Sequence, residues 1–83
     1  MYRIEISPRA RGQLRKLKIE YKFSLSLIIN DLKEDPFIGK PLVRDFLGRY
    51  SYRVGVYRII YRIKTKENPV EIITAGHRST VYN

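Results

Sequence analysis

Positively charged side chains recur on one side of an alternating segment in the second half of the chain, in a pattern suited to binding phosphate. Residues 57–64 read Tyr-Arg-Ile-Ile-Tyr-Arg-Ile-Lys, so Arg58, Arg62 and Lys64 share one parity. Because side chains of a strand alternate between two faces, these cations are predicted on one sheet face. The simplest register of the preceding strand adds Arg53. Like charges on adjacent strands destabilise a sheet, so the cluster favours an anionic ligand, although arginine is also a tolerable occupant of a solvated face.

The C-terminal segment Gly-His-Arg-Ser-Thr-Val-Tyr-Asn carries a second group of chemically capable residues. The ring of Tyr82 can stack on an unpaired base, as aromatic residues do in single-stranded RNA sites. The alternative is that the Tyr82 ring only packs against the hydrophobic core at the end of the chain. His77 can exchange a proton near neutral pH. An alternating strand would place it on the face opposite Arg78, where it only flanks that arginine.

Two helices are predicted to precede these strands. Ser7 and Pro8 are a capping hydroxyl followed by a proline at the first helical position, and apolar residues continue at helical spacing to Tyr21. Ser24 is predicted to cap a second helix, which ends before Pro36 because the residue preceding a proline is pushed out of the helical region. The brief connection between the two helices predicts an antiparallel hairpin with one shared apolar face.

The strands are predicted from a change of period. Residues 2–6 alternate polar and apolar, residues 36–49 read as a structured loop, and strands follow over 50–56, 57–64 and 70–75. The order β-α-α-β-β-β predicts an α+β domain, with the helical hairpin packed on one face of a small, mainly antiparallel sheet. Residues 1–83 are predicted to form a single domain. The first strand could pair in more than one place.

Charge and composition narrow the class of partner. Seventeen Lys and Arg against eight Asp and Glu give a net charge of +9, which attracts polyanions through counterion release. An acidic protein partner, or solubility alone, would also account for it. The chain has no cysteine and one histidine, so no metal or other cofactor is expected. No apolar run approaches the roughly 20 residues that cross a bilayer, and no signal peptide is evident, so a cytoplasmic protein without membrane contact is predicted.

Two motifs together resemble the RelE/ParE toxin superfamily. Residues 50–61, Tyr-Ser-Tyr-Arg-Val-Gly-Val-Tyr-Arg-Ile-Ile-Tyr, look like the central hairpin of that family, and the Gly-His-Arg ending followed by Val-Tyr is similar to the C-terminal motif of RelE-type toxins. The opening Ile-Ser-Pro-Arg-Ala, followed by leucines at helical spacing, also resembles the family. The likeness in element order covers the whole chain.

The resemblance implies a ribosome-dependent endoribonuclease that cleaves mRNA in the ribosomal A site. In RelE-type toxins the 2′-hydroxyl of the substrate attacks the adjacent phosphorus and expels the 5′-oxygen of the next nucleotide. By position, Arg58 matches the family's phosphate-contacting arginine, Arg78 the arginine near the leaving group, and Tyr82 the terminal tyrosine that orients the substrate. Gly55 stands where RelE has a basic residue that is a candidate general base, which makes His77 the substitute. Arg53, Arg62 and Lys64 would add RNA-binding charge.

The resemblance also implies partners and alternatives. A RelB-like antitoxin, acidic and disordered until it binds, is expected to cover the toxin, and operator DNA is expected only as a ligand of the toxin–antitoxin complex. A ParE-like toxin that inhibits DNA gyrase shares the fold. A degenerate relative that binds its antitoxin and cuts nothing is a third possibility. It stays open because Gly55 stands where RelE has a basic residue. A generic basic RNA-binding module is the fourth.

Overall fold

Two helices and a five-stranded sheet make up the computed structural model, which describes residues 2–64 and 69–77. In chain order the elements are β1 (Arg3–Ile6), α1 (Pro8–Arg15), α2 (Ile19–Glu34), the 3-10 turn η1 (Pro36–Ile38), β2 (Lys40–Pro41), the 3-10 turn η2 (Arg44–Phe46), β3 (Arg49–Val54), β4 (Tyr57–Ile63) and β5 (Pro69–His77). The predicted α+β class and element order are confirmed, with a two-residue strand added inside the predicted loop.

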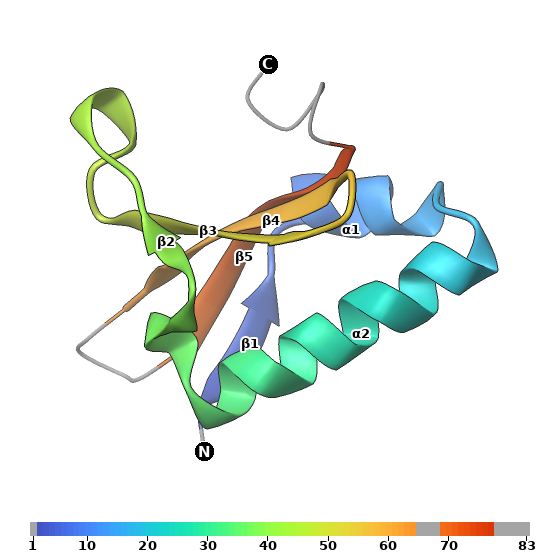
Figure 1. The fold of residues 1–83 in the computed structure, drawn as a ribbon, viewed down its shortest axis with the longest axis horizontal. Helices are drawn as coiled ribbons and strands as arrows, with labels where there is room; N and C mark the ends of the chain where they lie inside the picture. The colour runs from blue at the N-terminus through green and yellow to red at the C-terminus, as the bar shows by residue number, and fades with distance from the viewer. Residues whose placement is uncertain (1, 65–68, 78–83) are drawn as a thin grey trace.

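The strands lie in the order β1-β5-β4-β3-β2. Figure 1 shows β1 beside β5, β2 at the opposite edge, and α2 running along one side of the sheet. All neighbouring strands are antiparallel except β1 and β5, which are parallel, with Ile4 opposite Val70. Because β1 and β5 are joined only through the whole intervening chain, this parallel pair closes the domain by joining its first and last described strands.

The start of α1 agrees with the sequence pattern. The Ser7 hydroxyl accepts a hydrogen bond from the Ala10 amide at 3.0 Å and donates one to the Ile73 carbonyl at 2.7 Å, so the cap also fastens the helix to β5. At the other side of this helix, Gln13 Oε1 accepts hydrogen bonds from the Thr74 hydroxyl and the Ala75 amide, both at 2.9 Å. These bonds cover the part of the β5 edge that lies beyond the end of β1.

The predicted boundary between the helices is wrong. The first helix ends at Arg15 and the second begins at Ile19, so Ser24 lies inside α2, where its hydroxyl donates to the Glu20 carbonyl at 3.2 Å. A serine within a helix can make this bond to its own backbone without ending the helix. The helical spacing of apolar residues misled the prediction because Leu14 in α1 packs against the core, whereas Tyr21, at the next positions of the same spacing, belongs to α2 and packs on Tyr57.

The core lies between the helices and one sheet face. It contains Ala10, Leu25, Ile28 and Leu32 from the helices and Ile59, Tyr61, Val70, Ile72 and Ala75 from the sheet, each at most 3% exposed. The predicted packing of residues 57, 59, 61 and 63 toward the helices is confirmed, since Tyr57 and Ile63 pack against this cluster. The other sheet face is therefore left to Arg58 and the residues that share its parity.

A bulge in β5 decides which of its residues face the core. The partner of Ile60 is Thr74, whereas the partner of Tyr61 is Ile72, so Ile73 is the extra residue. A bulge reverses the alternation of side chains beyond it. Consequently Glu71 lies on the uncovered face although Ala75, of the same parity, is buried in the core.

No helix within residues 2–64 and 69–77 is long and apolar enough to cross a membrane.

Candidate nucleic-acid interface

The sheet face opposite the helices carries rows of paired residues across β3, β4 and β5. Beginning at the hairpin turn, the rows are Arg53–Arg58–Gly76, Ser51–Ile60–Thr74 and Arg49–Arg62–Glu71. The register thus places the three predicted arginines on one face, with Arg53 directly opposite Arg58. The middle row is neutral and at most 9% exposed. It separates an arginine pair near the turn from a mixed row at the other end.

The arginine pair lines a hollow of about 410 Å³. Its walls are Lys40, Leu42, Ser51, Arg53 and Arg58, so three cations surround a floor with a single hydroxyl and a single aliphatic side chain. No carboxylate of residues 2–64 or 69–77 lines it. Arg58 is half-buried, with its Nε atom out of contact with solvent, whereas Arg53 is exposed. Within the described chain, neither Lys40 nor Arg53 takes part in a salt bridge.

Lys40 is a site residue that the sequence reasoning missed, because residues 36–49 were interpreted as a loop. In the two-residue strand β2, Lys40 lies opposite Ser51 and so joins the arginines' face. The signal that was available is the proline at position 41, since proline in a sheet is confined to edge strands and bulges.

Tyr61 holds the segment that carries Lys40. Its hydroxyl donates a hydrogen bond to the Pro36 carbonyl at 2.7 Å and accepts one from the Gly39 amide at 3.0 Å. A Cβ at Gly39 would overlap that hydroxyl, so only glycine permits this approach. Burial raises the pKa of Tyr61 to about 12, which keeps the hydroxyl protonated and able to donate. A core tyrosine therefore positions a cation on the opposite face.

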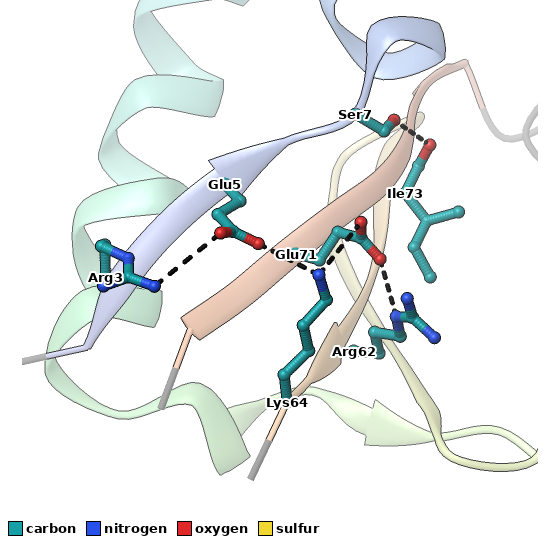
Figure 2. Close-up of polar contacts among 7 residues, drawn as sticks. All are labelled: Arg3, Glu5, Ser7, Arg62, Lys64, Glu71 and Ile73. Carbon is teal, nitrogen blue, oxygen red and sulfur yellow. Dashed lines mark hydrogen bonds and ion pairs between the residues drawn. The ribbon is translucent and has the colours of Figure 1, made fainter. Parts of the chain in front are cut away.

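Arg62 and Lys64, both predicted to bind RNA, are engaged by carboxylates. Arg62 Nε lies 2.6 Å from Glu71 Oε1, and Lys64 Nζ lies 3.8 Å from Glu71 Oε2 and 3.2 Å from Glu5 Oε1. Arg3 continues the chain at 3.8 Å from the second oxygen of Glu5. Figure 2 shows these five side chains alternating in charge across β1, β5 and β4.

His77 lies apart from the hollow. It is opposite Tyr57 on the helix-covered face, where its ring meets the Tyr57 ring edge-on at a centroid distance of 5.9 Å. Tyr57 in turn packs on Tyr21 at 4.3 Å, and burial together with Tyr21 raises the pKa of the Tyr57 phenol. The neighbour of Arg58 in the same row is Gly76, which has no side chain. The structure thus brings Arg53 and Arg58 together and does not bring His77 to them.

Gly55 has a backbone reason for being glycine. Val54 pairs with Tyr57, so Gly55 and Val56 form a two-residue turn between β3 and β4. The φ angle of Gly55 is +59°, as required at the first position of a type II′ turn, where glycine is preferred. The position at which the sequence resemblance led us to expect a basic residue is a hairpin turn in this chain.

The remaining predicted residues, Arg78 and Tyr82, lie outside the described residues. Among residues 2–64 and 69–77, no group of three His, Cys, Asp or Glu side chains is placed to hold a metal ion. The chemistry available in the described part is therefore that of fixed cations around a concave, partly desolvated floor. Such an arrangement is chemically able to bind a phosphodiester and to stabilise additional negative charge on its oxygens.

Known proteins resemble this chain over almost its whole length. Residues 4–82 match the family model described as the ParE toxin of the type II toxin–antitoxin system parDE. The Mycobacterium tuberculosis toxin RelG is 34% identical over 89 aligned residues, which cover 98% of this chain and 95% of RelG. Toxin RelE of the same organism is 32% identical over 83 residues, with 98% of this chain and 86% of RelE covered.

A solved structure shows the same fold. The toxin–antitoxin complex RelBE2 of Mycobacterium tuberculosis contains a chain that superposes with a TM-score of 0.83 at 34% identity, covering 93% of this chain and 98% of that one. The helical hairpin, the mixed sheet and the full-length sequence match agree. The chain belongs to the RelE/ParE superfamily, the toxins of type II toxin–antitoxin systems.

Proposed function

We propose that this toxin is a RelE-type endoribonuclease that cuts mRNA on the ribosome and thereby inhibits translation in the cytoplasm. The observation that carries the proposal is the hollow of Lys40, Arg53 and Arg58 on the uncovered sheet face. Like charges opposed on adjacent strands destabilise the free protein, and a bound phosphate removes that penalty. Two curated relatives named RelG and RelE, each above 30% identity, support the same activity.

The proposed reaction needs no cofactor. The 2′-hydroxyl of the substrate attacks the adjacent phosphorus, its proton passes to a base, and the 5′-oxygen of the next nucleotide leaves and takes up a proton. The products are a 2′,3′-cyclic phosphate and a 5′-hydroxyl. As the phosphorus gains its fifth oxygen, charge grows on the phosphoryl oxygens, where Arg58 and its neighbours in the hollow supply preorganised positive charge.

The C-terminal residues complete the proposed site. Arg78 is assigned to the charge that develops on the leaving oxygen, and Tyr82 to stacking on a substrate base. His77, predicted as the base, lies on the face opposite Arg58 and does not reach the hollow from its described position, so no proton transfer is assigned to it. The 2′-hydroxyl proton then goes to another group of the toxin or of the ribosomal complex.

The proposed regulator is a RelB-like antitoxin. The RelBE2 relative was solved as a toxin–antitoxin complex, and this toxin carries a net charge of +9, which suits an acidic segment laid over it. Binding of operator DNA is assigned to the toxin–antitoxin complex.

A ParE-like attack on DNA gyrase is the second candidate, because the matching family model carries the ParE description. One preparation tests both. In a translating extract, the purified toxin is expected to generate new mRNA 5′ ends bearing hydroxyl groups while gyrase supercoiling in a parallel reaction continues. Loss of supercoiling with intact mRNA would establish the ParE-like activity instead. Intact mRNA with continuing supercoiling would indicate a degenerate relative or a basic RNA-binding module.

The assignments to the C-terminal residues are tested with the same extract. Arg78→Ala and Tyr82→Ala are expected to abolish cleavage while the circular-dichroism spectrum and Tm stay unchanged. Tyr82→Phe is expected to keep most of the activity, because the phenylalanine ring can still stack on a base. Wild-type cleavage by both alanine variants would refute the assignment.

A further inference from the structure

Two sets of cations on the uncovered sheet face differ in whether carboxylates accompany them. The first is the hollow of Lys40, Arg53 and Arg58, whose lining in the described part of the chain contains no acid. The second is the ion-pair chain drawn in Figure 2, in which Arg62, Lys64 and Arg3 alternate with two glutamates and retain one net positive charge. Arg49, opposite Arg62 in the same row, adds a fourth cation at this end. Two carboxylates therefore accompany the four cations at this end, and none accompanies the three cations of the hollow among the described residues.

Glu71 is the centre of the ion-pair chain. Each of its two carboxylate oxygens faces a different cation, Arg62 at 2.6 Å and Lys64 at 3.8 Å. Its side chain is 23% exposed, the lowest value in the ion-pair chain, so these contacts are screened less than those of a fully exposed pair. The bulge in β5 is what turns Glu71 toward this face.

The separation between the two ends is large enough for the glutamates to act locally. Arg58 and Arg62 are four residues apart on β4, which corresponds to about 13 Å at the rise of a strand. The Debye length at physiological ionic strength is about 8 Å. The charge on Glu71 therefore weakens the attraction of Arg62 and Lys64 for an anion and leaves the hollow almost unaffected.

We propose that Glu71, assisted by Glu5, withholds Arg62 and Lys64 from the RNA backbone and confines the nucleic acid to the hollow of Lys40, Arg53 and Arg58. This inference rests on the proposed function, because it concerns how that RNA is placed. Glu71 is a positioning residue. It limits binding to one end of the face, so that a phosphate meets the hollow rather than sliding along a continuous row of cations.

The test is the salt dependence of binding to a fluorescein-labelled oligouridine RNA, measured by anisotropy with the full-length toxin and no ribosome. For single strands, each phosphate contact contributes a slope of about −0.7 in log K against log salt. Glu71→Gln is expected to steepen the slope by about 0.7–1.4, because it releases one or both cations. Between about 50 and 200 mM salt, each released cation then widens the affinity difference from wild type by about 2.6-fold.

Glu34→Gln is the matched control, since it removes the same charge from an exposed residue at the end of α2, away from the uncovered face. It is expected to leave the slope unchanged. A slope that steepens equally in both variants would show that bulk charge, and not the position of Glu71, sets the binding.

A double-mutant cycle isolates the role of Glu71. Arg62→Ala alone is expected to change the slope of log K against log salt by less than about 0.2. In the Glu71→Gln background, the same substitution should reduce the magnitude of the slope by about 0.7. Arg53→Ala should reduce it by about 0.7 in either background. Thermal melts of all variants check that they fold.

Two results overturn the inference: a loss from Arg62→Ala alone as large as that from Arg53→Ala, or no binding of RNA by the wild-type toxin at about 50 mM salt. Neither result contradicts the proposed function, because mRNA cleavage in the translating extract is measured separately. Conversely, a toxin that binds RNA as described and cuts no mRNA contradicts the proposed function only.

Discussion

Removal of the Tyr61 hydroxyl tests the link between the core and the basic face. Tyr61 is fully buried, and its hydroxyl joins the Pro36 carbonyl to the Gly39 amide. Tyr61→Phe retains the ring, including its stacking on Tyr50 at a centroid distance of 5.5 Å. The only loss is two hydrogen bonds, one of which leaves an amide donor without its partner.

The size of the effect follows from these contacts. A hydrogen bond contributes about 0.5–1.5 kcal/mol net, and a polar group left unsatisfied in a buried place costs about 1–3 kcal/mol. A total loss of about 2–3 kcal/mol is expected for Tyr61→Phe. In a domain of this size, 1 kcal/mol shifts Tm by about 4–8 °C, so Tm should fall by about 10–20 °C.

Urea titration and thermal melting measure this loss, and Tyr52→Phe is the control. Tyr52 is half-buried in the same sheet, and its hydroxyl makes no hydrogen bond within the described chain. A loss below about 0.5 kcal/mol for Tyr61→Phe, or equal losses for both variants, would refute the role given to the hydroxyl. RNA binding measured well below Tm should also weaken, because the segment that carries Lys40 is released.

Three further predictions concern stability. The raised pKa of Tyr61 favours the folded state while the phenol is neutral, so about 3 kcal/mol should be lost as pH rises from about 10 to 12. Tyr61→Phe should lack this part of the pH profile in urea titrations, and an identical profile would contradict it. Arg53→Thr should raise the unfolding free energy by about 0.2–1 kcal/mol, since it relieves the repulsion opposite Arg58, and it should weaken RNA binding. A decrease in the unfolding free energy would contradict the repulsion. Ser7→Ala should lower stability by about 1–2 kcal/mol in thermal melts, because it removes both the cap of α1 and the bond to Ile73, and an unchanged Tm would exclude that role.

Local patterns in the sequence predicted much of this fold. The alternation in residues 57–64 correctly separated core residues from cations, because alternation is a property of the strand itself. The Ser7-Pro8 pair correctly marked the start of α1. The Ser24 cap failed because a serine within a helix and a serine before one look alike in sequence.

The features that were missed depend on contacts distant in sequence. The two-residue strand that carries Lys40 exists because β3 pairs with it and Tyr61 holds its approach. The bulge at Ile73 reverses the alternation in β5, and simple counting along that strand gives no sign of it. That reversal places Glu71 among the cations and His77 among the aromatic residues, so the charge balance of the site follows from tertiary structure.

The central claim is that the hollow, rather than the overall positive charge, makes this toxin cut RNA. The measurement is the single-turnover rate at which ribosome-bound mRNA is cleaved by Arg58→Ala and by Arg11→Ala, which removes the same charge from the exposed surface of α1. Loss of a preorganised donor to a transition-state oxyanion is worth about 100- to 1000-fold in rate, so Arg58→Ala should slow cleavage by that factor, and Arg11→Ala by less than about threefold. Arg58→Lys, with its charge kept, should fold like wild type and recover part of the rate. Equal rates for Arg58→Ala and Arg11→Ala, in proteins with wild-type Tm, would contradict the claim.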